Sequence, residues 1–184
     1  DWYMAEWFRI NEAVVERDPS GFAPFRPKPN SEVQLLESSM RFNSLGFRGE
    51  DFAREKGERY RIVALGESTT MGATIFAGDE TWPVLLERRL REALPDRDVQ
   101  VVNAGVGGWN LKHNLRRLEQ QIFALEPDLV LWSYCANDNH RFLHRFDPIG
   151  HMLWTDEARA SLEIDSRWDQ FVSRSSILSR VRVC

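Results

Sequence analysis

Three short apolar runs, separated by two amphipathic stretches, constrain the fold of this chain more than any other feature. The runs cover residues 61–66, 99–103 and 129–135. Continuous apolar runs of this length are typical of strands that are buried on both faces. The intervening stretches, 81–94 and 110–125, have apolar side chains at helical spacing. This order predicts βαβ units, a parallel sheet and helices on both of its faces.

Each amphipathic stretch predicts a helix with one apolar face that packs on the sheet. On the first helix this face consists of Trp82, Leu85, Leu86, Leu90 and Leu94. On the second it consists of Leu111, Leu115, Leu118, Ile122 and Leu125. His113 falls near the polar side of the second helix, so we expect it to face solvent. A further helix is expected near residues 157–172.

The first 58 residues lack this regularity. Apolar side chains in residues 2–17 have helix-like spacing, and prolines 19, 24, 27 and 29 then predict an extended, non-helical crossing. No clean alternation of apolar and polar side chains is visible. We therefore expect an irregular N-terminal layer over residues 1–58, which packs on an α/β domain over residues 59–184.

Composition excludes several classes of function. The chain has 184 residues, of which 42% are hydrophobic and 28% charged, with a formal net charge of −4. These values fit a globular domain. Basic residues are dispersed, so there is no electrostatic case for nucleic acid or an anionic membrane surface. No apolar run approaches the roughly 20 residues of a membrane-spanning helix. Neither Cys135 nor Cys184 has a CxxC neighbour, which argues against zinc.

A polar or glycine-rich motif follows each predicted strand. The first contains Ser68, the second contains three glycines and ends at Gly108, and the third contains Asn137. Taken singly, these are ordinary helix caps, loops and turns. At the carboxyl ends of adjacent parallel strands, however, a hydroxyl nucleophile, a glycine N–H and a side-chain amide are the groups that acyl transfer needs.

Two phosphate-binding alternatives fail on spacing. Gly105 and Gly107 fit a dinucleotide fingerprint, but its third glycine position is Asn110. No lysine follows either glycine-rich segment, as a phosphate-binding P-loop requires.

The three motifs together resemble those of the SGNH hydrolases, also called the GDSL esterase/lipase family. Residues 66–68 resemble the Gly-Asp-Ser block, which implies that Ser68 is the nucleophile and that its N–H is one oxyanion donor. The resemblance makes the Gly108 N–H and the Asn137 side chain the other two donors. Residues 43–48 resemble a segment often found upstream in bacterial members. The implied fold is a three-layer, flavodoxin-like parallel sheet.

The sequence departs from the family pattern in three places. Glu67 replaces the usual aspartate, and Cys135 replaces a glycine. The family's Asp-x-x-His block, which supplies the base, does not occur in these residues. We expect it, and the last strands of the sheet, to lie beyond Cys184, and we expect the 184 residues alone to be inactive. His140 is the candidate base within this sequence.

These observations predict a serine-dependent acyl-ester hydrolase or an O-acyltransferase. The alternative is a non-catalytic binding or accessory module that keeps the cleft but lacks the base. Glu67 and Trp109 are candidate substrate-binding residues. The substrate would be a small-molecule, carbohydrate or lipid ester, and no cofactor or metal is implied. By resemblance alone the source is bacterial, and an export signal or membrane anchor upstream stays open.

Overall fold

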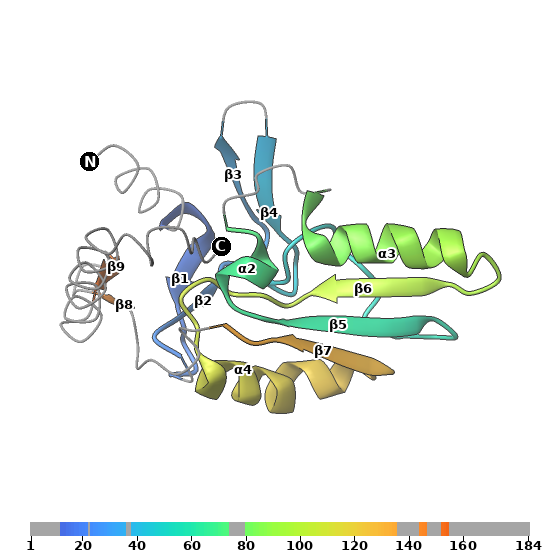
Figure 1. Cartoon of the computed structure of the whole chain (residues 1–184). Helices are drawn as coiled ribbons and strands as arrows, with labels where there is room; N and C mark the ends of the chain where they lie inside the picture. The colour runs from blue at the N-terminus through green and yellow to red at the C-terminus, as the bar shows by residue number, and fades with distance from the viewer. Residues whose placement is uncertain are drawn as a thin grey trace, which may run out of the picture.

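A three-stranded parallel sheet forms the centre of the computed structural model (Figure 1). The structure describes residues 12–21, 23–35, 38–73, 80–135, 144–146 and 152–154. The strands are β5 (Tyr60–Gly66), β6 (Val99–Asn103) and β7 (Leu129–Ser133), in the order β6-β5-β7. The predicted strands and their parallel direction are thereby confirmed, and the first strand lies between the other two.

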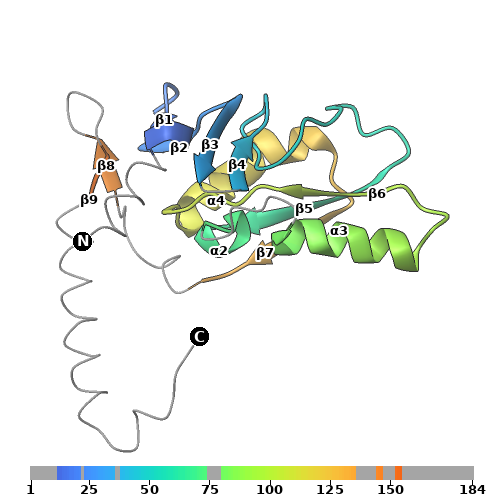
Figure 2. The same ribbon diagram turned by 90° about the horizontal axis from the view of Figure 1, so that it is seen from above.

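Helices cover both faces of this sheet, as Figures 1 and 2 show. Helix α3 (Trp82–Ala93) lies on one face. Helix α4 (Leu111–Arg117) lies on the other and continues into a π-helical turn, η2 (Leu118–Ile122), and a 3-10 turn, η3 (Phe123–Leu125). The three-layer arrangement agrees with the expected fold class.

Alternate residues of β5 supply the two apolar cores, because neighbouring side chains of a strand point to opposite faces. Ile62 and Ala64 face α3 and pack with Leu86 and Leu90. The opposite core contains Val63, Leu65, Val102, Ile122 and Leu125. The sheet is thus buried on both sides, as its continuous apolar strands predict.

The predicted apolar face of the second helix is wrong in its first half. Leu111 and Leu115 are exposed, whereas His113, Asn114 and Arg117 are buried. The prediction assumed an uninterrupted 3.6-residue period. The π-helical turn instead inserts about one extra residue, which rotates the following side chains. The buried face therefore changes along the helix, and polar residues occupy its first half.

The N-terminal region is more regular than the sequence suggested. Strands β1 (Val15–Arg17) and β2 (Phe25–Pro27) pair antiparallel, and so do β3 (Ser31–Leu35) and β4 (Ser38–Phe42). The expectation of an irregular layer is wrong for these segments. In β3, Ser31 and Val33 are buried while Glu32 is exposed. The alternation was hidden because a serine occupies one of the inward positions.

Two further strands, β8 (His144–Phe146) and β9 (Met152–Trp154), pair antiparallel. The helix expected near 157–172 lies outside the described residues. Within the part of the chain that the structure describes, no helix has the length and apolar character to cross a bilayer.

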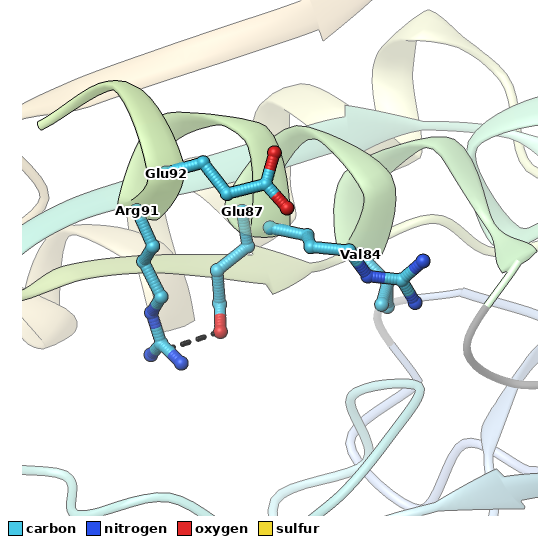
Figure 3. Close-up of a pocket in the computed structure, with 5 residues that line it drawn as sticks. Val84, Glu87, Arg91 and Glu92 are labelled. Carbon is cyan, nitrogen blue, oxygen red and sulfur yellow. Dashed lines mark ion pairs between the residues drawn. The ribbon is translucent and has the colours of Figure 1, made fainter. Parts of the chain in front are cut away.

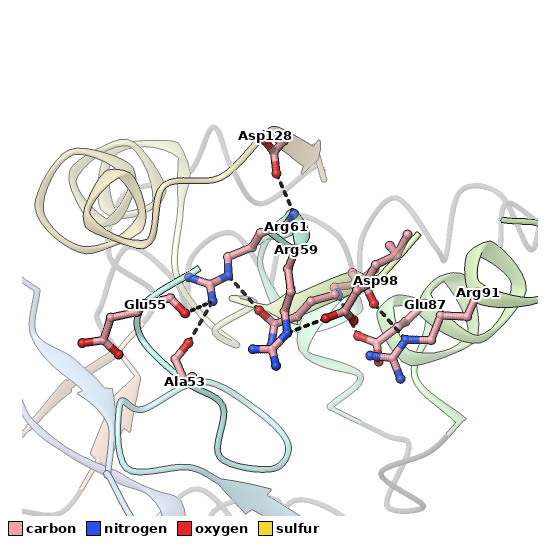
Figure 4. Close-up of polar contacts among 11 residues, drawn as sticks. Ala53, Glu55, Arg59, Arg61, Glu87, Arg91, Asp98 and Asp128 are labelled. Carbon is pink, nitrogen blue, oxygen red and sulfur yellow. Dashed lines mark hydrogen bonds and ion pairs between the residues drawn. The ribbon is translucent and has the colours of Figure 1, made fainter. Parts of the chain in front are cut away.

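A buried arginine at the amino end of β5 forms hydrogen bonds with the neighbouring segments (Figure 4). Arg61 is fully buried, and its guanidinium donates to the carbonyls of Ala53 at 2.8 Å and Leu125 at 2.7 Å. Its backbone N–H donates to Asp128 Oδ2 at 2.7 Å. These polar contacts lie at the amino ends of β5 and β7, opposite the carboxyl ends at which chemistry gathers in parallel sheets.

Candidate active site

Ser68 lies at the carboxyl end of the central strand. It is the first residue of α2 (Ser68–Met71), and only Glu67 separates it from β5. Ser68 is partly exposed, whereas Thr70 and Met71 are buried. A methyl group on Gly66 would lie 2.2 Å from Thr70 Oγ1, so the strand can turn this sharply into the helix only because residue 66 is glycine.

Glu67 is a buried helix cap. Its side chain is fully buried, and Oε1 accepts hydrogen bonds from the N–H of Thr69 at 3.0 Å and from its hydroxyl at 2.7 Å. Oε2 accepts from the N–H of Ser68 at 2.5 Å and from its hydroxyl. The carboxylate is thus enclosed by the turn that it caps, and the expected contact of Glu67 with substrate stays a prediction.

The glycine-rich loop after β6 lies directly beside this turn. Val106 N–H donates to Gly66 O at 3.1 Å. A methyl group on Gly107 would lie 3.6 Å from Ser68 Cβ. Gly108 has a φ of +79°, a conformation that favours glycine. The first two sequence motifs therefore meet at one edge of the sheet, as predicted.

The side chain of Asn103, the last residue of β6, forms hydrogen bonds with both of these motifs. Its Nδ2 donates to Thr70 O at 2.9 Å, and its Oδ1 accepts from Gly105 N–H at 3.0 Å. A methyl group on Gly105 would lie 2.2 Å from Met71 N. The loop and the helix are thus in close backbone contact, and an asparagine at the strand end satisfies groups on both.

The third motif is only partly described. Gly66 pairs in register with Ser133, so the carboxyl end of β7 lies beside that of β5. Asn137 and His140 lie outside the described residues, so their roles stay predictions. Cys135, the first residue of this motif, is partly exposed.

Trp109 does not line a cleft. Its ring is 2% exposed, and Nε1 donates to the carbonyl of Phe25 at 3.1 Å. This hydrogen bond ties the start of α4 to β2, and Ala23 and Val106 complete the cluster. The Trp109 side chain thus packs in this cluster, and its expected contact with substrate stays a prediction.

His113 is buried and does not face solvent as expected. It is 2% exposed, and its Nδ1 accepts from the N–H of Asn110 at 3.2 Å. The Asn110 side chain in turn accepts from His113 N–H at 3.3 Å, which completes a capping box at the start of α4. Burial lowers the pKa of His113 to about 4, so the ring is neutral at pH 7.

Sequence reasoning missed two buried arginines next to the motif loops. Arg48 is 6% exposed, and its Nη1 donates to Met71 O at 2.6 Å and to Gly72 O at 2.5 Å. Burial lowers the pKa of Arg48 to about 10, which still leaves it charged at pH 7. Its only signal in the sequence was its position at the end of segment 43–48.

Arg117 is the second of these arginines. It is 2% exposed, and it donates to Ala104 O at 3.0 Å and to Gly46 O at 2.9 Å. Its guanidinium lies 4.5 Å from the ring centroid of Phe47. Burial lowers its pKa to about 9. The side chain thus joins α4, the glycine-rich loop and segment 43–48.

Two surface hollows lie on the α3 side of the molecule, away from these motifs. One, of about 430 Å³, is formed by Val84, Glu87, Arg88, Arg91 and Glu92 on the outside of α3 (Figure 3). The other, of about 360 Å³, is apolar and lies between α3 and the sheet. Neither is lined by Ser68, so we do not assign either of them to substrate.

Comparison with known proteins identifies the family. The model of the GDSL-like lipase/acylhydrolase family matches residues 64–180. An arylesterase of Vibrio mimicus is 35% identical over 81 residues, which are 44% of this chain and 39% of that protein. AlinE4, an SGNH-hydrolase family esterase of known crystal structure, is 30% identical over 45% of this chain and 43% of its own, with a TM-score of 0.37.

The chain thus spans about two fifths of the length of these relatives. The family match covers more than half of the chain and includes the carboxyl end of β5, the Ser68 turn, the glycine-rich loop and β7. On this evidence the chain belongs to the GDSL-like lipase/acylhydrolase family, the SGNH hydrolases.

Proposed function

We propose that the protein hydrolyses carboxylic esters and that Ser68 is its nucleophile. The observation that carries the proposal is the position of Ser68. It is partly exposed at the carboxyl end of the central strand, and the glycine-rich loop packs beside it. A hydroxyl at such a place can meet a bound carbonyl, and backbone N–H groups of the neighbouring loop can stabilise the oxyanion.

In the proposed reaction, Ser68 Oγ forms a bond to the ester carbonyl carbon, and a histidine base takes the hydroxyl proton. The Ser68 N–H, the Gly108 N–H and Asn137 Nδ2 donate to the tetrahedral oxyanion. The C–O bond to the alcohol then breaks, and the leaving alkoxide takes the proton back from the histidine. Water attacks the acyl-enzyme in the same way and releases the acid.

The contact between Glu67 and Ser68 bears on this mechanism. The Ser68 N–H and hydroxyl both donate to Glu67 Oε2. An N–H that donates to a carboxylate has to turn from it before it can donate to an oxyanion. The proposed mechanism therefore includes a small reorientation of the Ser68 turn when substrate binds.

The test is ester hydrolysis by the full-length protein and its Ser68→Ala variant, with p-nitrophenyl acetate as substrate. We expect the variant to fold, because Ser68 is only partly buried, and to lose turnover. Ser39→Ala, in the β3–β4 hairpin, is a matched control that should keep it. Equal turnover in the wild type and Ser68→Ala would refute the nucleophile assignment.

The same preparation separates two alternatives. An O-acyltransferase uses the same serine but passes the acyl group to an alcohol, so added alcohols would yield a new ester in place of free acid. A non-catalytic accessory module would bind ester ligands with no turnover in the wild type.

A further inference from the structure

Buried side chains hold the carboxyl end of the short helix that carries Ser68. Asn103 Nδ2 donates to Thr70 O at 2.9 Å. Arg48 Nη1 donates to the next two carbonyls, those of Met71 at 2.6 Å and Gly72 at 2.5 Å. Three successive carbonyls, which a helix leaves without intrahelical partners at its end, are thus satisfied from outside the helix.

The helix depends on such external contacts because of its length. Helix α2 has four residues, Ser68–Met71, and a single turn is not stable on its own hydrogen bonds. Gly72 N–H and Ala73 N–H both donate to Ser68 O. Of the two residues whose carbonyls Arg48 holds, Gly72 is bonded directly back to Ser68, and Met71 N–H donates to Glu67 O at 2.9 Å.

Arg48 is itself fixed in position. Its backbone N–H donates to Asn103 O at 3.2 Å. The turn before it is closed by Asn43, whose Oδ1 accepts from Leu45 N–H at 3.0 Å and from Phe47 N–H at 2.9 Å. These hydrogen bonds fix the backbone of segment 43–48, and from this position the Arg48 side chain reaches the carboxyl end of α2.

Charge strengthens this contact. Arg48 is 6% exposed, and its pKa of about 10 keeps it protonated at neutral pH. Charge-assisted hydrogen bonds away from water are stronger than neutral ones. A cation at the carboxyl end of a helical turn also complements the partial negative charge of the carbonyls there.

From these contacts we propose that Arg48 is a positioning residue for the nucleophile, which acts by fixing the helical turn that presents Ser68. The proposal rests on the proposed function of Ser68. Segment 43–48 would then be part of the working site, and Arg48 would act on Ser68 through the backbone of Met71 and Gly72.

The experiment compares full-length wild-type protein with Arg48→Gln, Arg48→Lys and Ser68→Ala. Arg41→Gln is the control, because Arg41 lies nearby on β4 and is exposed, with an ion pair to Glu50 at 2.8 Å. Two quantities are measured: kcat and KM for p-nitrophenyl acetate, and the rate at which a fluorophosphonate labels Ser68. Circular dichroism at the assay temperature reports folding.

We expect Arg48→Gln to lower kcat and the labelling rate about 10- to 100-fold, the size expected for a misplaced reacting group, with little change in KM. Arg48→Lys keeps the charge and should retain more activity than Arg48→Gln. Arg41→Gln should match the wild type. Both positioning and a loss of folded protein lower the apparent kcat at an unchanged KM, but only a loss of folded protein lowers the ellipticity. An unchanged ellipticity in Arg48→Gln therefore assigns the loss of kcat to positioning.

Three results would overturn the proposal. The first is Ser68-dependent turnover with an unchanged kcat in folded Arg48→Gln. The second is failure of both Arg48 variants to fold, which would make the arginine a support of the whole domain. The third is wild-type turnover in Ser68→Ala. This result would refute the proposed role of Ser68 itself, whatever the Arg48 variants do.

Discussion

The carboxylate of Glu67 accepts hydrogen bonds from both the backbone N–H and the hydroxyl of Ser68. Glutamate is not among the preferred helix caps, which have shorter side chains. Here its side chain folds back onto the first two residues of the helix, Ser68 and Thr69. The residue that departs from the family's usual aspartate is thus the one that holds the proposed nucleophile.

Removal of this cap should destabilise the domain. Glu67→Ala leaves the N–H groups of Ser68 and Thr69 without their acceptor, and we expect a loss of about 1–2 kcal/mol in the free energy of unfolding. Urea denaturation measures the loss. Glu50→Ala, at a carboxylate whose side chain is 80% exposed, is the control and should stay within about 0.5 kcal/mol of the wild type. Equal stability of the two variants would mean that the cap contributes nothing.

Arg117 should matter more for stability than its neighbour on the same helix. Arg117→Met removes the donors to Ala104 O and Gly46 O and leaves buried carbonyls unsatisfied. We expect a loss of about 3 kcal/mol in the free energy of unfolding. Arg116→Met, at an exposed position, should change it by less than about 0.5 kcal/mol. Similar denaturation midpoints for both variants would contradict the assignment.

The lowered pKa of His113 predicts that the free energy of unfolding falls in acid. Burial, aided by Lys112 and Arg116, lowers its pKa from 6.5 to about 4. Between these pH values the unfolded chain binds a proton that the folded chain does not. The stabilisation that the neutral, buried His113 contributes to folding is therefore complete above pH 6.5 and is lost as the pH falls toward 4. At about 1.4 kcal/mol per pKa unit, we expect the loss in the free energy of unfolding to approach about 3 kcal/mol.

The measurement is the free energy of unfolding at several pH values for the wild type and His113→Gln. The difference between the two curves isolates the histidine from carboxylates that titrate in the same range. We expect the wild type to lose more stability than the variant as the pH falls. Parallel curves would show that His113 titrates alike in both states.

The parallel sheet could be predicted from the sequence because each of its strands is marked by a short apolar segment of consecutive residues. Residues 62–65 are an unbroken apolar run that is followed by a glycine, and the strand ends at that glycine. The position of Ser68 followed from the same boundary. The meeting of the Ser68 turn with the glycine-rich loop followed from parallel topology, since consecutive strands with helical crossovers place their carboxyl ends at one edge.

The polar supports could not be predicted in this way. Arg48, Arg117 and His113 are charged or titratable residues, which pattern reasoning assigns to the surface. Each is buried because backbone carbonyls or a helix cap supply its partners. The partners of Arg48 and Arg117 come from other segments of the chain, so neither spacing nor composition reveals them. The partner of His113 is Asn110, three residues before it, in a capping box that the assumed apolar face obscured. The π-helical turn at 118–122 likewise left no periodic signal.

Asn137 provides a separate test of the oxyanion assignment. In the full-length protein, Asn137→Ala should lower kcat by about 10²- to 10³-fold, the effect of one lost oxyanion donor. Its acyl-enzyme should still form, at a reduced rate. Steady-state kinetics with p-nitrophenyl acetate measure the change. Turnover at the wild-type rate would mean that this asparagine serves only the turn after β7.

The most direct test of the account is the identity of the residue that becomes covalently modified. Full-length protein is treated with a fluorophosphonate, digested, and examined by mass spectrometry while residual ester hydrolysis is followed. We predict one phosphonyl group per chain, on the peptide and residue of Ser68, and loss of activity in proportion to labelling. Complete labelling of another residue, or ester turnover that persists when Ser68 is fully modified, would contradict the central claim.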